Sequence, residues 1–249
     1  MDIPAIASNA LARRIARYPL RILPRGIALP ILSGPLRGKK WIVGSFLHEC
    51  WLGTYESDFQ NRLVKEIKIG TVFYDIGANV GFYSLLAAKL VGSGSVYAFE
   101  PLPANVKYLR KHLQLNGIDN VKPIEMAISD SCGPVSFVTE QSRGMGRLEP
   151  GGDLSVEGST LDALIRDERI APPNYIKMDI EGAEFHALLG ARQCFEHHKP
   201  VLFLATHGRD IHKKCFELLQ SWDYEIETIR QSEADRAEIV SHPRSSSEC

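Results

Sequence analysis

The feature that most constrains this chain is a β-type run that ends in a glycine-rich turn and continues as a helix. Residues 71–76 read TVFYDI, the pattern of a buried strand, and residues 77–81 read GANVG. A helical stretch, 82–90, follows at once. Small residues at such a junction let a ligand approach the backbone, and the helix start offers free N–H donors. The segment therefore predicts a nucleotide-binding turn.

Downstream of this turn, β-rich runs alternate with helical stretches. The expected strands are 71–76, 95–100, 121–128, 175–179, 201–206 and 224–229. The expected helices are 82–90, 104–116, 183–195 and 211–222, with a further one at 58–67 before the turn. This rhythm predicts an α/β, Rossmann-like fold, in which a mostly parallel twisted sheet carries helices on both faces.

Composition divides the chain into three parts. Residues 1–50 form a basic extension, with a helix expected at 7–18, a Pro/Gly-rich segment and a short strand or hairpin at 39–47. Residues 51–240 form the α/β domain, in which the Gly-rich stretch 139–158 is expected to be a mobile loop. Residues 241–249 are expected to be a disordered tail.

The N-terminal charge suggests an anionic partner. Residues 1–40 carry a net charge of +7 while the whole chain carries −1. Residues 1–25 are therefore expected either to contact anionic lipid or a membrane surface, or only to pack on the domain with their arginines solvated. Aromatic residues do not interleave with the basic ones, so no nucleic-acid partner is expected. The sequence specifies no oligomeric state.

The cysteines and the hydrophobic runs indicate a compartment. The five cysteines are scattered without a paired motif, which is typical of a reducing environment. No apolar run is long enough for a transmembrane helix, and no secretory signal pattern is present. A cytoplasmic location follows as the expectation, with peripheral contact at the inner membrane surface as its variant.

The acidic residues near the turn indicate which nucleotide-like ligand it binds. Glu100 ends the second expected strand, where a carboxylate can accept both ribose hydroxyls, and Asp75 ends the first. Asp75 would repel a pyrophosphate but suits the cationic ammonium and sulfonium of S-adenosylmethionine, and the closer G-x-G-x-x-G turn of NAD-binding proteins is absent. We therefore predict S-adenosylmethionine as cofactor. Its predicted binding residues are Asp75, Gly77, Asn79, Gly81, Phe82, Glu100, Ala127, Ser129 and Asp179.

A second group of polar residues follows the fourth and fifth strands. Asp179 ends strand 175–179 and Glu181 follows it, and His207 comes after the apolar run 201–204. Methyl transfer to an alcohol needs an aligned acceptor and removal of its proton, for which histidine is the natural base. His207, Asp179 and Glu181 are therefore the predicted catalytic residues. The two acids are too few to predict a metal site.

Several motifs together resemble the FkbM family of methyltransferases over about residues 50–230. They are GTYE at 53–56, DIGANVGFYS at 75–84, FEP at 99–101, LNG at 115–117, STLD at 159–162, IKMDIEGAE at 176–184, and His207. The resemblance implies a class I methyltransferase fold. It also implies methyl transfer from S-adenosylmethionine, often to a hydroxyl of a sugar, glycan or other natural product.

The resemblance leaves alternatives open. Some family members methylate nitrogen in peptides or amides, and a non-catalytic cofactor-binding scaffold is a third hypothesis. Tyr55 and Glu56 are expected either to close over the cofactor as a lid or to pack with the entry helix. The family usually has an acid two residues before the fifth-strand histidine, where this chain has Ala205. A small-molecule or glycan acceptor is the expected partner.

Overall fold

The computed structural model describes residues 24–140, 145–148, 152, 154–231 and 236–244. It divides into two compact units, Met1–Tyr55 and Glu56–Cys249. This division falls a few residues after the boundary expected at 50. The helix expected at 7–18 lies outside the described residues. None of the described helices combines the length and apolar character that a bilayer-spanning segment requires.

The described residues of the first unit, 24–55, form a small hairpin-like pair of strands and one short helix. Strand β1 (Ala28–Pro30) pairs antiparallel with β2 (Lys40–Ile42), which confirms the strand expected within 39–47. Helix α2 (His48–Leu52) ends at Gly53 with a φ of 81°. A Cβ at Gly53 would lie 2.0 Å from the carbonyl oxygen of Ser33, so only glycine permits this close approach.

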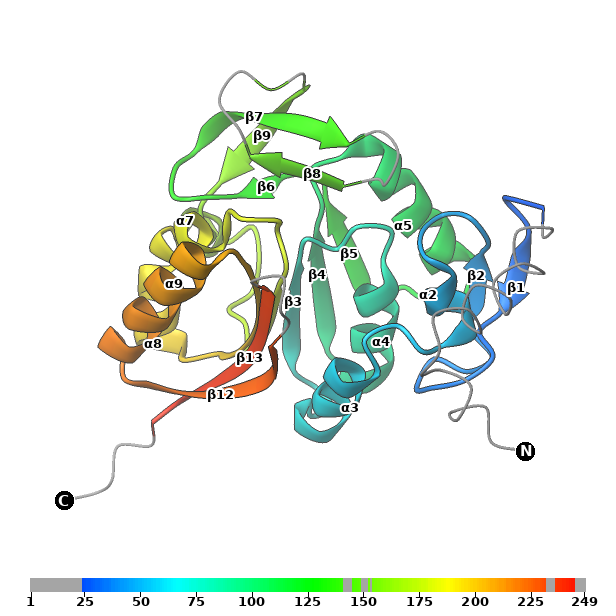
Figure 1. Cartoon of the computed structure of the whole chain (residues 1–249), viewed down its shortest axis with the longest axis horizontal. Coiled ribbons are helices and arrows are strands. Elements are labelled where there is room, and N and C mark those ends of the chain that lie inside the picture. Colours follow the sequence, from blue (N-terminus) through cyan, green and yellow to red (C-terminus); the bar gives the residue numbers. More distant parts are fainter. Residues whose placement is uncertain (1–23, 141–144, 149–151, 153, 232–235, 245–249) are drawn as a thin grey trace. The chain divides into compact units, whose positions relative to one another are not determined.

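The second unit is built on a seven-stranded sheet in the order β12-β13-β11-β10-β3-β4-β5 (Figure 1). The strands are β3 (Val72–Ile76), β4 (Ser95–Phe99), β5 (Val121–Ile124), β10 (Tyr175–Met178), β11 (Val201–His207), β12 (Tyr224–Gln231) and β13 (Arg236–Pro243). Neighbours from β11 to β5 run parallel, whereas β13 is antiparallel to both β11 and β12. The strand order reverses between β3 and β10, and ligands bind at such switch points in α/β sheets.

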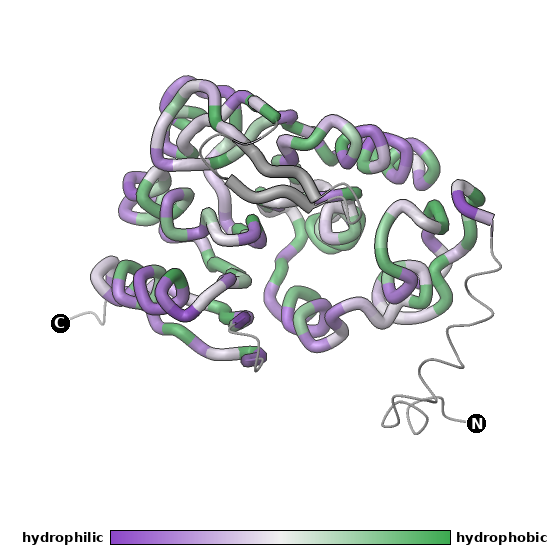
Figure 2. The backbone as a smooth tube through the Cα atoms, turned by 45° about the horizontal axis from the view of Figure 1, so that its top comes forward, coloured by the Kyte–Doolittle hydropathy of each residue, from purple (hydrophilic) through white to green (hydrophobic). Residues whose placement is uncertain are grey.

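Helices cover both faces of this sheet, as predicted. They are α3 (Ser57–Glu66), α4 (Phe82–Val91), α5 (Pro103–Leu115), α6 (Leu161–Arg166), α7 (Glu184–Leu189), α8 (Arg192–His198) and α9 (Arg209–Ser221). Hydrophilic and hydrophobic stretches alternate along the helices in Figure 2, the pattern of elements that bury one face. In α9, for example, Cys215 and Leu219 lie one turn apart and are buried.

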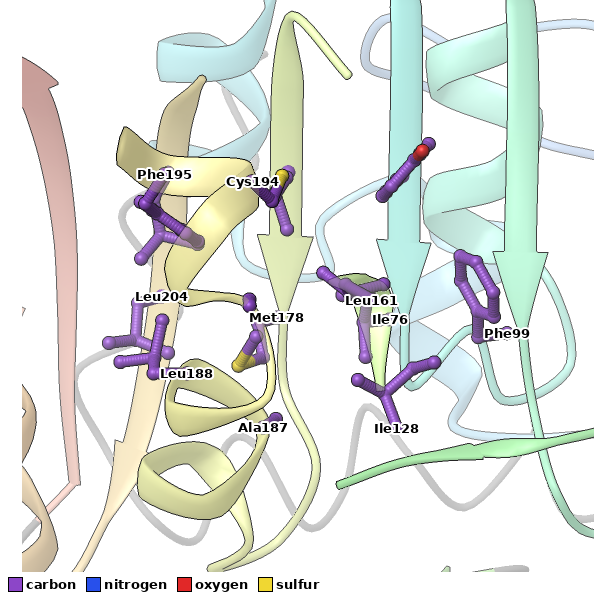
Figure 3. Packing of buried hydrophobic residues seen from close by; sticks show 14 of the residues in the cluster. Ile76, Phe99, Ile128, Leu161, Met178, Ala187, Leu188, Cys194, Phe195 and Leu204 are labelled. Carbon is purple, nitrogen blue, oxygen red and sulfur yellow. The ribbon is translucent and has the colours of Figure 1, made fainter. Parts of the chain in front are cut away.

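The main core lies between one face of the sheet and helices α6 to α9. Figure 3 shows Ile76, Phe99, Met178 and Leu204, from four parallel strands, beside side chains of α7 and α8. Because side chains alternate along a strand, Asp75 points to the opposite face from Ile76. That face is covered by α3, whose Phe59 packs edge-on against Phe203 at 6.0 Å between ring centroids. The predicted fold class is confirmed.

Two expected elements are each divided in the structure. The run 121–128 forms β5 and, after a tight turn, β6 (Ala127–Ile128), which leaves the large sheet and pairs with β9 (Leu154–Ser159). The expected helix 183–195 is broken into α7 and α8 around Gly190. A Cβ at Gly190 would lie 2.1 Å from the carbonyl oxygen of Ser129, so the chain turns there around a contact with another segment.

Two further expectations are wrong. The expected loop 139–158 belongs largely to a second sheet of order β6-β9-β7-β8, with β7 at Gly133–Glu140 and β8 at Met145–Leu148. The disordered tail was expected from residue 241, but Ser241–Pro243 belong to β13 and Ser241 is fully buried. Residues 154–158 pair with β6 and β7, and Ser241 pairs with Leu202 of β11, and local composition does not reveal such pairing between separate segments. Residues 245–249 lie outside the described part.

Candidate active site

The turn after β3 has a backbone that small residues favour. Gly77 and Gly81 have φ values of 78° and 94°, and Asn79 has a φ of 51°. A Cβ on Gly77 would lie 2.0 Å from the carbonyl oxygen of Asp179. Since no carbon and oxygen atoms approach so closely without a bond, this position requires glycine. The predicted nucleotide turn therefore packs directly on the first residue after β10.

Glu100, which follows β4, accepts a hydrogen bond from the same turn. Its Oε2 accepts a hydrogen bond from the backbone N–H of Asn79 (2.8 Å). Its Oε1 accepts from the N–H of Leu102 (3.0 Å) and the side-chain amide of Asn105 (3.1 Å). Burial raises the pKa of Glu100 to about 7, although all three donors act in the opposite direction. A rigid carboxylate thus stands at the strand end where ribose hydroxyls bind in nucleotide folds.

Asp75 and Lys177 form a buried pair between β3 and β10. The Lys177 ammonium lies 3.6 Å from Asp75 Oδ1, and Ser84 donates to Asp75 Oδ2 at 2.6 Å. Lys177 also donates to the carbonyl oxygen of Gly77 (3.2 Å) and lies over the Tyr83 ring at 5.1 Å. Burial raises the pKa of Asp75 against the effects of Lys177 and Ser84. The pair ties the glycine turn to β10.

The three predicted catalytic residues lie together at the carboxyl ends of β10 and β11. His207 Nε2 lies 3.6 Å from Asp179 Oδ1 and 3.5 Å from Glu181 Oε2. Burial raises the pKa of Glu181. Burial has the same tendency at Asp179, but Lys177, Arg236 and His207 outweigh it and hold the pKa of Asp179 below its usual value. Two carboxylates with different proton affinities therefore face one imidazole edge.

Glu184 holds the other edge of this imidazole. Its Oε1 lies 2.9 Å from His207 Nδ1 and also accepts hydrogen bonds from the backbone N–H groups of Gly182 and Ile180. A carboxylate bound in this way only accepts, so Nδ1 carries the proton and Nε2 is turned toward Asp179 and Glu181. Burial opposes the charged imidazolium, but Glu184 and the facing carboxylates outweigh it and raise the pKa of His207.

Arg236 is a site residue that the sequence pattern did not predict. It lies on β13 directly opposite His207 on β11. Its guanidinium donates to Glu56 Oε1 (2.9 Å) and to Asp179 Oδ2 (3.2 Å), and Glu56 Oε2 accepts from the Tyr83 hydroxyl (2.7 Å). Glu56 therefore joins this cluster through Arg236. The only local signal for Arg236 was a basic residue at the start of an alternating run.

A second residue of β13 lies opposite Ala205, the position at which the family pattern has an acid. Glu238 pairs with Ala205 across the antiparallel ladder, so their side chains share one face of the sheet. Ala205 and Glu238 are both buried, and Glu238 lies 3.8 Å from the Arg236 guanidinium. Strand β13 therefore supplies a carboxylate beside the position where the family pattern has an acid.

The other predicted cofactor residues have less defined surroundings. Phe82 is buried at the first position of α4, and Ala127 and Ser129 are buried at and just after β6. Tyr55 ends the first unit, where its ring packs edge-on against Phe46 with 6.0 Å between centroids. Contact of these four residues with cofactor stays a prediction.

The sheet order, with its reversal beside a glycine turn and its antiparallel strand β13, defines a class I methyltransferase fold. The chain belongs to the FkbM methyltransferase family, because the model of the methyltransferase FkbM domain matches residues 75–229. The predicted family is therefore confirmed.

Relatives of known name or structure agree with this assignment. The chain is 26% identical over 137 residues to the hexuronic acid methyltransferase AglP of Haloferax volcanii, covering 54% of this chain and 56% of the relative. An FkbM methyltransferase structure from Methylobacillus flagellatus matches with a TM-score of 0.53 and 20% identity, over 70% of this chain and 43% of that one. A precorrin-6y C5,15-methyltransferase structure from Geobacter metallireducens has a TM-score of 0.50 and 14% identity, over 76% and 89%. The chain spans only about half the length of the first two relatives.

S-adenosylmethionine is the cofactor of this family, and the residues of this chain fit it. A Cβ at Gly81 would lie 2.5 Å from Leu109, so Gly81 allows the turn to pack against α5, while Gly77 and Asn79 of the turn remain partly exposed. Glu100 is the candidate partner of the ribose hydroxyls. Asp179 is the candidate source of negative charge toward the cofactor's cationic groups. Asp75, which the sequence predicted in this role, is instead fully buried and paired with Lys177, so it supports the turn.

Proposed function

We propose that this chain is an S-adenosylmethionine-dependent O-methyltransferase that acts on a hydroxyl of a sugar, a glycan or a related natural product. The observation that carries the proposal is the adjacency of the cofactor turn and the His207 cluster. Gly77 packs against Asp179, and Asp179 Oδ1 faces His207 Nε2 at 3.6 Å. A cofactor held at the turn and an acceptor held at the cluster would therefore meet within one small region.

The bound cofactor supplies a methyl group on a sulfonium, which passes to the acceptor oxygen as the carbon–sulfur bond breaks and neutral S-adenosylhomocysteine forms. Glu100 would hold the ribose, and the buried Asp75–Lys177 pair would keep the turn in place. Asp179 and Glu181 would hold and orient the acceptor hydroxyl. Alignment of the reacting atoms at about 3–3.5 Å accounts for much of the rate of such displacements.

His207 is the side chain best placed to accept the hydroxyl proton. Its Nδ1 proton is committed to Glu184, so its Nε2 is the basic atom that faces the cluster. The arrangement matches the general principle that a catalytic base is oriented by a third group. The lone pair of an amide nitrogen is delocalised into its carbonyl group and would need stronger activation, so the imidazole favours oxygen as the methylated atom.

The relative AglP supports a sugar acceptor, because its name specifies hexuronic acid. This likeness covers about half of each chain, so it supports the substrate class and not the individual sugar. N-methylation of a peptide or amide is the second candidate within enzymes. A non-catalytic scaffold is opposed by the number of polar side chains that converge on one cluster.

The test combines binding and transfer. Calorimetry with S-adenosylhomocysteine should show binding that Glu100→Ala weakens. Methyl-labelled S-adenosylmethionine, incubated with neutral and acidic oligosaccharides and with peptides, should then yield an O-methyl sugar, identified by mass spectrometry. His207→Gln should lose transfer. His197→Gln should retain it, because His197 lies in the last turn of α8, where its ring bonds the Gln193 carbonyl oxygen.

Three results would contradict the proposal in different ways. Label on a peptide nitrogen would favour N-methylation. Tight binding of S-adenosylhomocysteine without transfer to any acceptor in a cell extract would favour the scaffold. Absence of cofactor binding by the intact protein would remove both enzyme hypotheses.

A further inference from the structure

We propose that Asp179, Glu181 and His207 bind a divalent cation. One ligand atom from each residue can be chosen so that all three lie within 4.8 Å of one another. The inference rests on the proposed function only for what the cation does. The sequence predicted no metal, because its two acids lacked a third ligand; the fold adds His207 from the neighbouring strand.

The spacing of these atoms suits a shared cation better than direct hydrogen bonds. The distances from His207 Nε2 to Asp179 Oδ1 and Glu181 Oε2 are 3.6 and 3.5 Å. Hydrogen bonds of this type are about 2.7–3.2 Å long. Ligands at right angles around a cation, with bonds of about 2.1–2.6 Å, lie about 3.0–3.7 Å apart. The cluster therefore has the dimensions of one face of a coordination sphere.

The imidazole is oriented for coordination. Glu184 is fully buried, accepts the Nδ1 proton of His207, and is itself held by the N–H groups of Gly182 and Ile180. Metal-binding histidines commonly donate their second N–H to a carboxylate, which fixes the tautomer and makes the free nitrogen a better ligand. Nε2, with its lone pair, is thereby directed at two carboxylates.

A buried oxygen without a partner gives independent support. Asp179 Oδ1 has almost no solvent exposure and no hydrogen-bond partner among the described residues, while Oδ2 accepts from Arg236. Burying a carboxylate oxygen without a donor or a cation is costly. Oδ1 is also the Asp179 atom that faces His207 Nε2. A cation between them would satisfy both atoms.

An excess of carboxyl groups around the cluster also favours a bound cation. The described residues linked by these ion pairs comprise more carboxyl groups than basic groups. The carboxyl groups are Glu56, Asp75, Asp179, Glu181, Glu184 and Glu238, and the basic groups are Lys177, Arg236 and His207. A divalent cation would offset much of the excess negative charge in this weakly solvated region.

Two carboxylates and one imidazole suit Mg²⁺ or a first-row cation such as Mn²⁺, and three protein ligands leave positions for the acceptor. A cation there would lower the pKa of an acceptor hydroxyl bound to it. His207 would then serve as a ligand, and the hydroxyl proton would pass to solvent instead of to the imidazole. Neighbouring hydroxyls of a sugar could occupy two of the open positions.

The test is a titration of chelator-treated full-length protein with Mn²⁺, followed by electron paramagnetic resonance of the free ion. We expect one bound equivalent. Glu181→Gln and His207→Gln should weaken binding by more than the roughly 10- to 100-fold caused by loss of an outer partner. Glu196→Gln, a change at an exposed carboxylate paired with Arg192, should leave Mn²⁺ binding unchanged. Circular dichroism would establish that each variant is folded.

Two results would overturn the inference: no Mn²⁺ binding by the intact protein, or equal binding by Glu181→Gln and His207→Gln. Calorimetry with S-adenosylhomocysteine on the same samples separates this outcome from failure of the proposed function. Cofactor binding without Mn²⁺ binding would leave the methyltransferase proposal standing, with His207 as the base. Mn²⁺ binding without cofactor binding would leave only the metal site.

Discussion

His207 and Arg236 lie directly opposite each other on the antiparallel strands β11 and β13. Through this pairing, a residue near the end of the chain contacts Asp179 at 3.2 Å and Glu56 at 2.9 Å. The guanidinium thus links the loop after β10 to the start of α3. Its loss would remove the cationic partner of the largely buried Glu56 and leave Asp179 with Lys177 and His207.

Arg236→Met should reduce methyl transfer by at least about tenfold, because Glu56 loses its cationic partner and Asp179 loses the donor that holds its Oδ2 in place. Steady-state rates and S-adenosylhomocysteine affinity are the measurements. Arg244→Met is the matched control, since Arg244 is exposed just beyond the end of the same strand and pairs with Asp223 and Glu225. Equal losses in both variants would mean that Arg236 only stabilises β13.

Gly77→Ala should destabilise the protein and abolish cofactor binding. The new Cβ would lie 2.0 Å from the Asp179 carbonyl oxygen, at a φ of 78°. Gly117→Ala separates the two causes, because Gly117 also has a positive φ, 60°, but a Cβ added there would meet no atom within 4 Å. Strain alone should cost on the order of 1–2 kcal/mol at Gly117, measured by urea unfolding, and Gly77→Ala should cost clearly more.

Cofactor affinity should depend on pH through Glu100. Burial raises its pKa to about 7 in the free protein, and the ionised carboxylate is the form that accepts from two ribose hydroxyls. The dissociation constant of S-adenosylhomocysteine should therefore fall as pH rises from about 6 to about 8, the range around this pKa. Glu100→Gln should bind more weakly and lose this dependence. A pH dependence that persists in Glu100→Gln would assign the titration to another group.

His112 should make stability depend on pH in the acid range. Its ring is fully buried, its Nδ1 bonds the Val80 carbonyl oxygen at 2.7 Å, and burial lowers its pKa to about 4. The unfolded chain, with a pKa near 6.5, binds more protons between about pH 4 and 6.5, so stability is full above that window and decreases as pH falls through it. The decrease attributable to His112 is about 3 kcal/mol. Urea unfolding of the native chain and of His112→Gln would be compared at about pH 7 and about pH 4.5, on either side of most of this window. The difference between their changes in unfolding free energy would give the contribution of His112.

Membrane contact of the basic extension stays a prediction, since residues 1–23 lie outside the described part. Flotation with vesicles containing anionic lipid should carry the full-length protein, and deletion of residues 1–25 should abolish it. Vesicles of neutral lipid are the control, because the expected attraction is electrostatic. Equal flotation of both proteins would mean that these residues do not bind the membrane and that their arginines are only solvated.

The local sequence was sufficient to predict the parallel part of the fold and the glycine turn after β3. The strand-turn-helix pattern at 71–90 and the acid at Glu100 depend on residues close together in the chain, where periodicity and turn chemistry act directly. Asp179, Glu181 and His207 could also be predicted to meet, because the carboxyl ends of parallel strands share one edge of the sheet.

The tertiary structure decided what depends on pairing between distant segments. Strand β13 pairs with β11, β6 pairs with β9, and Gly190 packs on Ser129. Composition alone does not show these partners, so residues 139–158 and 241–243 were assigned wrongly from it. The same pairing brings Arg236 opposite His207 and Glu238 opposite Ala205. The sequence alone therefore determined the glycine turn and three residues of the candidate site, whereas the fold decided which charges surround them, because the cross-strand register sets which side chains share a face.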